Sequence, residues 1–173
     1  QWAGAAVAGP KSREVLNNCV EEPSLITNEK IHIMGVISTF LKGKIPCRIA
    51  RISFSGELAF EVYIKSDFAN TMMDLLWENA QKYDGCLYGL EALGALRVEK
   101  GHVTGAELDG RVTIDDAGLG KMASIKKSYI GSAMRKRGVL SDDDRETLVG
   151  FFPTDLKETF NAGTIVCEKH NIK

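Results

Sequence analysis

Apolar and polar residues alternate along much of the first third of the chain, which is the pattern of half-buried β-strands. Ala3–Ala8 is an apolar run closed by Gly9-Pro10, and this predicts a buried strand followed by a turn. In the segment Leu58–Ile64, apolar residues alternate with Glu61 and Tyr63. Strands are therefore predicted at Ala3–Ala8, Ile31–Leu41, Ile45–Ile52 and Leu58–Ile64, and later at Leu148–Phe152.

Between these predicted strands, apolar residues recur at the spacing of a helix. Pro10 suits the first turn of a helix, and Ser66-Asp67 is a good start for an amphipathic one that Asp84-Gly85 ends. Cys86-Leu87-Tyr88 reads as a short strand or an extended entry to the next helix, which ends near Gly101. The predicted helices are Ser12–Cys19, Phe68–Tyr83, Leu90–Lys100 and a segment through Ala133-Met134-Arg135.

This mixture predicts an α+β fold, with mixed or antiparallel sheets packed with helices. The charged turn at Ser141–Arg145 is the best boundary candidate, so we expect one domain at 1–143 and the start of a β-rich domain at 144–173. The chain starts on an apolar run without Met and ends just after the strand-like Gly163–Cys167. We therefore expect both ends to lie inside a longer polypeptide.

Composition is that of a soluble globular protein, with 173 residues, 44% hydrophobic, 26% charged and a net charge of -1. Nothing in this balance favours nucleic acid or an anionic membrane surface, although it leaves room for a local basic pocket that takes a small anion. No apolar run approaches the roughly 20 residues that span a bilayer. The four cysteines and three histidines lack metal-ligand spacing. We interpret the cysteines as small buried hydrophobes of a cytoplasmic protein.

Four segments resemble a known family. Residues 2–13 read WAGAAVAGPKSR, similar to a family pattern WA-x-[LIV]-A-V-x-GP-x-[SA]-R. Residues 51–62 read RISFSGELAFEV, which resembles R-x-[SG]-[YF]-[TS]-G-E-x-G-F-E, and residues 88–101 read YGLEALGALRVEKG, which resembles G-x-x-A-x-x-x-LR-x-E-x-G. Tyr129-Ile130-Gly131 resembles DF-[IV]-GK, with Ser132 in place of Lys.

The resemblance is to the folate-binding domain shared by glycine-cleavage aminomethyltransferases and sarcosine oxidase alpha subunits. Gly94-Ala95 and Glu99-Lys100-Gly101 look more like sarcosine oxidase alpha or dimethylglycine dehydrogenase, and Leu93 stands where the glycine-cleavage enzyme usually has arginine. The resemblance implies a tetrahydrofolate site here, a C-terminal β-barrel domain starting near residue 144, and FAD, FMN and NAD sites elsewhere. It also implies beta, gamma and delta subunits as partners.

Glu61 is the first candidate for contact with folate. A pterin has an edge rich in N–H donors, and a carboxylate is the natural bidentate acceptor for such an edge. Glu61 matches the family's pterin-binding glutamate, whereas strand alternation alone favours a solvent-facing residue. Glu57 lies in a glycine turn that permits close approach of a ligand, or is a plain exposed acid.

Three more residues complete the candidate set. Phe54 flanks the pterin or fills the core, and we favour the core. Arg97 contacts the folate carboxylates or forms an intramolecular ion pair with Glu61 or Glu99. Tyr88 stacks on or hydrogen-bonds to the ligand, or is structural. The family's catalytic aspartate belongs to a part that would precede Gln1.

Three functions fit these observations. The first is part of a sarcosine oxidase, which demethylates sarcosine oxidatively and transfers the carbon to tetrahydrofolate, giving 5,10-methylenetetrahydrofolate, glycine and hydrogen peroxide. The second is an aminomethyltransferase of the glycine-cleavage type or a dimethylglycine dehydrogenase-like folate domain. The third is a folate-binding or regulatory module without catalysis.

The 173-residue chain alone is expected not to oxidise sarcosine, because it has no dinucleotide fingerprint and no match to the catalytic aspartate. An assay for hydrogen peroxide release from sarcosine checks this. Turnover without added subunits would contradict it.

Overall fold

The computed structural model describes residues 1–142, 144–155, 157–161 and 163–166. These residues form two compact units, Gln1–Thr104 and Gly105–Lys173. The domain boundary predicted at 143/144 stays a prediction.

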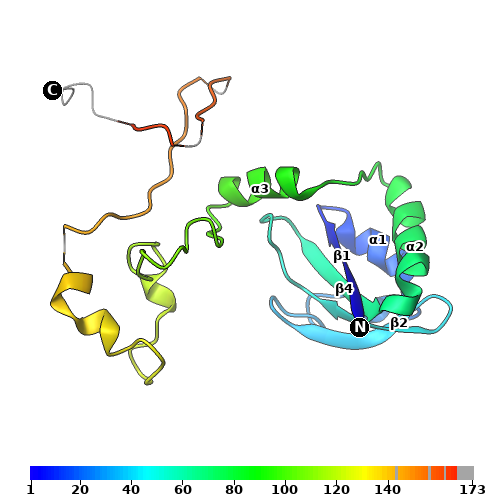
Figure 1. The fold of residues 1–173 in the computed structure, drawn as a ribbon. Coiled ribbons are helices and arrows are strands. Elements are labelled where there is room, and N and C mark those ends of the chain that lie inside the picture. The colour runs from blue at the N-terminus through cyan, green and yellow to red at the C-terminus, as the bar shows by residue number, and fades with distance from the viewer. Residues whose placement is uncertain (143, 156, 162, 167–173) are drawn as a thin grey trace. The chain divides into compact units, whose positions relative to one another are not determined.

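The first unit is built on a four-stranded antiparallel sheet of β1 (Trp2–Ala8), β2 (Val36–Leu41), β3 (Ile45–Ala50) and β4 (Ala59–Lys65). The strand order in the sheet is β1-β4-β3-β2 (Figure 1). The first and the last strand in the sequence are neighbours in this sheet. β1 pairs with β4 in a register that places Ala5 opposite Val62. On the other side of β4, Ile49 of β3 lies opposite Val62. The strand predicted at Ala3–Ala8 is thus confirmed.

Two helices, α1 (Ser12–Cys19) and α2 (Ala69–Gln81), pack on one face of this sheet (Figure 1). On α1, Val15, Leu16 and Cys19 recur at helical spacing and are buried. Burial of one large apolar side chain contributes roughly 1.5–3 kcal/mol, so the core holds the sheet and both helices together. Its fully buried large side chains are Phe60, Leu16, Ile26, Ile31, Leu41, Ile49, Ile64, Met72, Val20, Val62 and Cys19.

The predicted strand at Ile31–Leu41 is wrong in its first half. Ile31 is fully buried, but Ile33 and Met34 are both exposed, so the alternation that a strand requires begins only at Val36. Met34 has φ of 66° and the N–H of Gly35 bonds to the carbonyl of His32 at 2.8 Å. A tight turn therefore occupies the place of the expected strand.

The helix predicted at Phe68–Tyr83 is confirmed in type but is shorter. A 3₁₀ turn at Ser66–Phe68 leads into α2, which begins at Ala69 and ends at Gln81. The helix predicted at Leu90–Lys100 is confirmed as α3 (Leu90–Glu99). The segment between α2 and α3, which includes Cys86-Leu87-Tyr88, forms no strand and is instead an irregular entry.

In the second unit the regular elements among the described residues are short 3₁₀ turns, at Gly120–Met122, Met134–Lys136 and Gly138–Leu140. The helix expected near Ala133–Arg135 is thus a single 3₁₀ turn. The strand predicted at Leu148–Phe152 is wrong, since these residues have no regular structure. Of the strand-like Gly163–Cys167, the described part is also irregular and Cys167 lies outside the described residues.

An ion pair organises the start of this unit. The Asp116 side chain is nearly fully buried, pairs with Arg145, and accepts a hydrogen bond from the N–H of Thr113 at 2.7 Å. The bonds from Arg145 and Thr113 favour the charged carboxylate and lower the pKa of Asp116 well below its usual range.

The helices of the described residues do not have the length and apolar character that a membrane-spanning helix requires.

The interpretation of the cysteines as buried hydrophobes is confirmed for two of them. Cys19 and Cys47 lie in the core, where desolvation raises the pKa of each thiol to about 11. For Cys86 it is wrong, because this residue lies in the irregular segment after α2 and is exposed. Cys167 lies outside the described residues.

The cysteines are expected to differ in reactivity in the folded protein. At pH 8, a thiol with a pKa of about 11 is almost entirely protonated, and the thiolate is the reactive form. In a Cys167→Ser background, an aromatic disulfide reagent should therefore label Cys86 quickly and Cys19 and Cys47 only after unfolding. Fast labelling of three thiols in the folded protein would contradict this placement.

Candidate functional site

The sheet face opposite α1 and α2 carries Glu61. Because Phe60 and Val62 point into the core, strand alternation directs Glu61 to the other face, where it is half-buried. The register places Ala6 of β1 on one side of it and Ala50 of β3 on the other. Small side chains therefore flank the carboxylate across three neighbouring strands.

Tyr63 lies two residues further along β4 on the same face as Glu61. Its hydroxyl donates a short hydrogen bond to Oε2 of Glu61. This bond, together with burial and the nearby negative charge, raises the pKa of the Tyr63 phenol. The ring lies against Gly4, where an added Cβ would come within 3.1 Å of the ring carbons. The absence of a side chain at Gly4 thus gives Tyr63 its position.

The Arg48 guanidinium brings positive charge to the same face. Arg48 lies opposite Tyr63 in the register, and its guanidinium carbon sits 4.9 Å from the ring centroid of Trp2. A cation over an indole ring is stabilised by the negative face of the ring. The face around Glu61 therefore carries an acidic group and, on Trp2, a stacked basic group.

The loop before β4 packs on the C-terminal end of α3. Gly101 has φ of 73°, and its N–H bonds to the carbonyl of Val98 while that of His102 bonds to Arg97. This is a Schellman motif, which ends the helix and turns His102 back over its last turn. The rings of His102 and Phe54 contact each other edge to face, with 4.7 Å between their centroids. Lys100 Nζ also donates to the carbonyl of Ser53 at 2.5 Å.

Phe54, Glu57 and Arg97 occupy this junction or its border. Phe54 is 36% exposed and packs on His102, so the interpretation that it fills the core is wrong. Arg97 is half-buried, and its Nη1 donates to the carbonyl of His102 at 3.2 Å. Glu57 is an exposed residue of the turn that follows Gly56, where φ is 93°.

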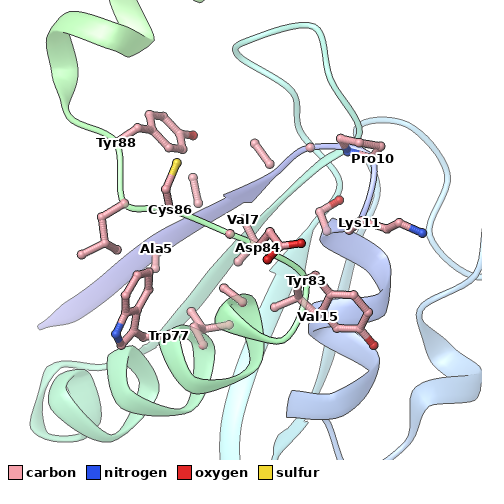
Figure 2. A pocket seen from close by; sticks show the side chains of 18 of the residues that line it. Ala5, Val7, Pro10, Lys11, Val15, Trp77, Tyr83, Asp84, Cys86 and Tyr88 are labelled. Carbon is pink, nitrogen blue, oxygen red and sulfur yellow. The ribbon is translucent and has the colours of Figure 1, made fainter.

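Tyr88 lies elsewhere, at a cavity of about 330 Å³ beside β1 (Figure 2). The cavity lies among β1, the start of α1, α2 and the segment after α2, and Trp77, Tyr83 and Cys86 also line it. Glu61 is not among its lining residues. Tyr88 thus lines a cavity that Glu61 does not line, whereas Phe54 and Arg97 both contact His102.

These residues can bind a ligand through a carboxylate, a guanidinium and aromatic rings. Within the described ranges, no group of three His, Cys, Asp or Glu side chains could hold a metal ion. A half-buried carboxylate above small residues is suited to accept hydrogen bonds from a flat ligand with adjacent N–H donors.

Three contributors, Tyr63, Arg48 and His102, were not singled out from the sequence. Tyr63 could have been found, because residues i and i+2 of a strand share a face. His102 had a weaker signal, since only the left-handed Gly101 turns it toward Phe54.

Comparison with known proteins places the chain in a family. Residues 1–127 match the GCVT N-terminal domain. The alpha subunit of sarcosine oxidase from Rhizobium meliloti is 37% identical over 177 residues, which cover 98% of this chain. The alpha subunit from Corynebacterium sp. strain U-96 is 35% identical over 156 residues, or 90% of the chain.

Aminomethyltransferases are also similar. The enzyme from Caldanaerobacter subterraneus is 29% identical over 158 residues, which cover 86% of this chain and 39% of that enzyme. The chain spans only 16–17% of the length of the two sarcosine oxidase subunits. The fold of the first unit, the order of the four motifs and the match over residues 1–127 lead to one conclusion: the chain belongs to the family of the GCVT N-terminal domain.

Proposed function

We propose that the sheet face around Glu61 binds the pterin of tetrahydrofolate. The observation that carries the proposal is the half-buried carboxylate of Glu61 between Ala6 and Ala50. A flat ring needs a floor without long side chains, and these two methyl groups leave the carboxylate accessible from above the sheet. The carboxylate then accepts two N–H groups from the pterin edge.

The other candidate residues surround different parts of the ligand in this proposal. Arg97 supplies positive charge for the glutamate carboxylates of folate, held in place by the hydrogen bond to His102. Phe54, packed on His102, offers a partly exposed ring face for the aromatic part of folate. Glu57 contacts the ligand from its exposed turn in this proposal, whereas Tyr88, which lines the cavity beside β1, has a structural role.

The intact protein is proposed to be the alpha subunit of a sarcosine oxidase. The similarity of 35–37% to two such subunits supports this assignment. Sarcosine and oxygen would give glycine and hydrogen peroxide, while tetrahydrofolate accepts the carbon as 5,10-methylenetetrahydrofolate. FAD, FMN and NAD would be held in other parts of the enzyme, beta, gamma and delta subunits would be its partners, and the cytoplasm its location. A C-terminal β-barrel domain starting near residue 144 completes the proposal.

A glycine-cleavage aminomethyltransferase is the second candidate, favoured by the similarity to the enzyme from Caldanaerobacter. Leu93 on α3 weighs against it, because the glycine-cleavage enzyme usually has arginine there. The two differ in their need for an electron acceptor. Oxygen uptake on addition of sarcosine to the full-length protein with its subunits separates them.

Replacing Glu61 with Gln should weaken folate binding without unfolding the protein. The substitution keeps the size but removes the charge and turns one acceptor oxygen into a donor. A charge-assisted hydrogen bond contributes roughly 1.5–3 kcal/mol. Affinity for tetrahydrofolate should therefore fall about 10- to 100-fold, as measured by titration of the full-length protein.

Glu78→Gln is the matched control, because Glu78 is an exposed carboxylate on α2, away from this face. It should bind folate like the wild type. A thermal melt of each variant distinguishes binding from folding. Unchanged affinity in Glu61→Gln would leave Glu61 as an ordinary strand residue, and a collapsed melt would make its role structural.

The titration of Tyr63 reports on Glu61 directly. The neutral phenol donates to the carboxylate and the phenolate would be repelled by it, so its pKa is above the usual value of about 10. In Glu61→Gln the repulsion disappears and the pKa should fall. The measurement is tyrosinate absorbance against pH, with Tyr63→Phe identifying the signal. An identical curve for wild type and Glu61→Gln would contradict the hydrogen bond.

A further inference from the structure

A second concave surface lies in the other unit, far from Glu61 in sequence. It has a volume of about 680 Å³, within the range of small-molecule sites. The segment from residue 124 to 141 forms it, through loops and 3₁₀ turns. Its polar lining includes Lys126, Lys127, Ser128, Ser132, Arg135 and Lys136.

The charged residues that line this surface are all positive. Between Asp116 and Asp142 the sequence contains six Lys and Arg residues and no Asp or Glu. None of the residues lining the cavity is acidic. The net charge of the whole chain is -1, so this concentration of positive charge is local. Neighbouring cations without counter-ions repel one another, and a bound anion would relieve that repulsion.

Arg135 is the one lining cation whose charge is already matched. Its Nε and Nη2 donate to the two carboxylate oxygens of Asp115, each at 2.7 Å. This fork geometry fixes the side chain and raises the pKa of Arg135. Arg135 therefore forms a wall of the cavity, while its charge is neutralised by Asp115.

The lysines are available for a ligand. Lys126, Lys127 and Lys136 are exposed, and no ion pair among the described residues engages their ammonium groups. Hydroxyl groups also line the cavity. Ser128 and Ser132 make no side-chain hydrogen bond within the part of the chain that the structure describes.

We propose that this cavity binds a phosphorylated small molecule through Lys126, Lys127 and Lys136, with Ser128 and Ser132 as hydroxyl donors. A carboxylate is best matched by a planar guanidinium fork, and the fork in this cavity is occupied by Asp115. Ammonium groups act as point charges, and the several oxygens of a tetrahedral phosphoryl group can accept ammonium and hydroxyl donors from different directions. The chemistry of the lining therefore favours phosphate over carboxylate.

The test is a calorimetric titration of the full-length protein with inorganic pyrophosphate, and with citrate as a polycarboxylate of comparable charge. Pyrophosphate should bind more tightly than citrate, and its affinity should fall as salt is raised. Replacement of all three lysines, K126Q/K127Q/K136Q, should weaken pyrophosphate binding about tenfold or more, since three charge contacts are lost. The control K30Q/K42Q/K157Q removes three exposed lysines that neither line the cavity nor belong to the basic stretch around it, and should leave binding unchanged.

A second variant keeps the charge and tests the hydroxyls. S128A/S132A should weaken pyrophosphate binding by a few-fold and leave the binding of citrate unchanged. The proposal is overturned if pyrophosphate does not bind, if both lysine triples lose affinity equally, or if citrate binds as tightly as pyrophosphate. Because these probes contain no pterin and Glu61→Gln leaves this cavity intact, the result is independent of the folate assignment.

Discussion

The antiparallel pairing of β1 with β4 is the interaction on which the first unit depends. It joins the first residues of the chain to a strand that begins more than fifty residues later, and it aligns the apolar positions of both strands on the face that α1 and α2 cover. The same register decides what the opposite face looks like. With Ala6 beside Glu61 and Gly4 beneath Tyr63, the carboxylate and its phenol partner stand on a floor of small residues. Because strand alternation has a period of two, a shift of one residue would move Glu61 into the core.

A second constraint links the loop before β4 to α3. The left-handed conformation of Gly101 ends the helix and turns the chain back, so that His102 meets Phe54 and accepts a hydrogen bond from Arg97 through its carbonyl. A residue with a side chain at position 101 would strain this turn, since the left-handed region disfavours a Cβ. The glycine therefore affects the site through geometry, without contact with a ligand.

Much of the first unit was predictable from local pattern. Alternation identified the strand with Glu61, and helical spacing identified α1, α2 and α3, because these signals depend on which residues face the core. The same reasoning failed at Ile33 and Met34, where hydrophobic residues are exposed in a turn, and at Leu148–Phe152, which is irregular. Hydrophobic residues alone do not distinguish a strand from a segment that has no partner strand, since strands require pairing.

The sequence by itself determined the family and the two-sided character of β4, because motifs and alternation are carried by residue order. It also contained the concentration of positive charge between Asp116 and Asp142. Only the tertiary structure decided that Ala6 and Ala50 border Glu61, that Tyr63 holds its carboxylate, that Phe54 packs on His102 and not in the core, and that Arg135 is neutralised by Asp115. The physical reason is that each of these contacts depends on strand register, backbone turns or side-chain direction, and none of these is fixed until distant parts of the chain pack together.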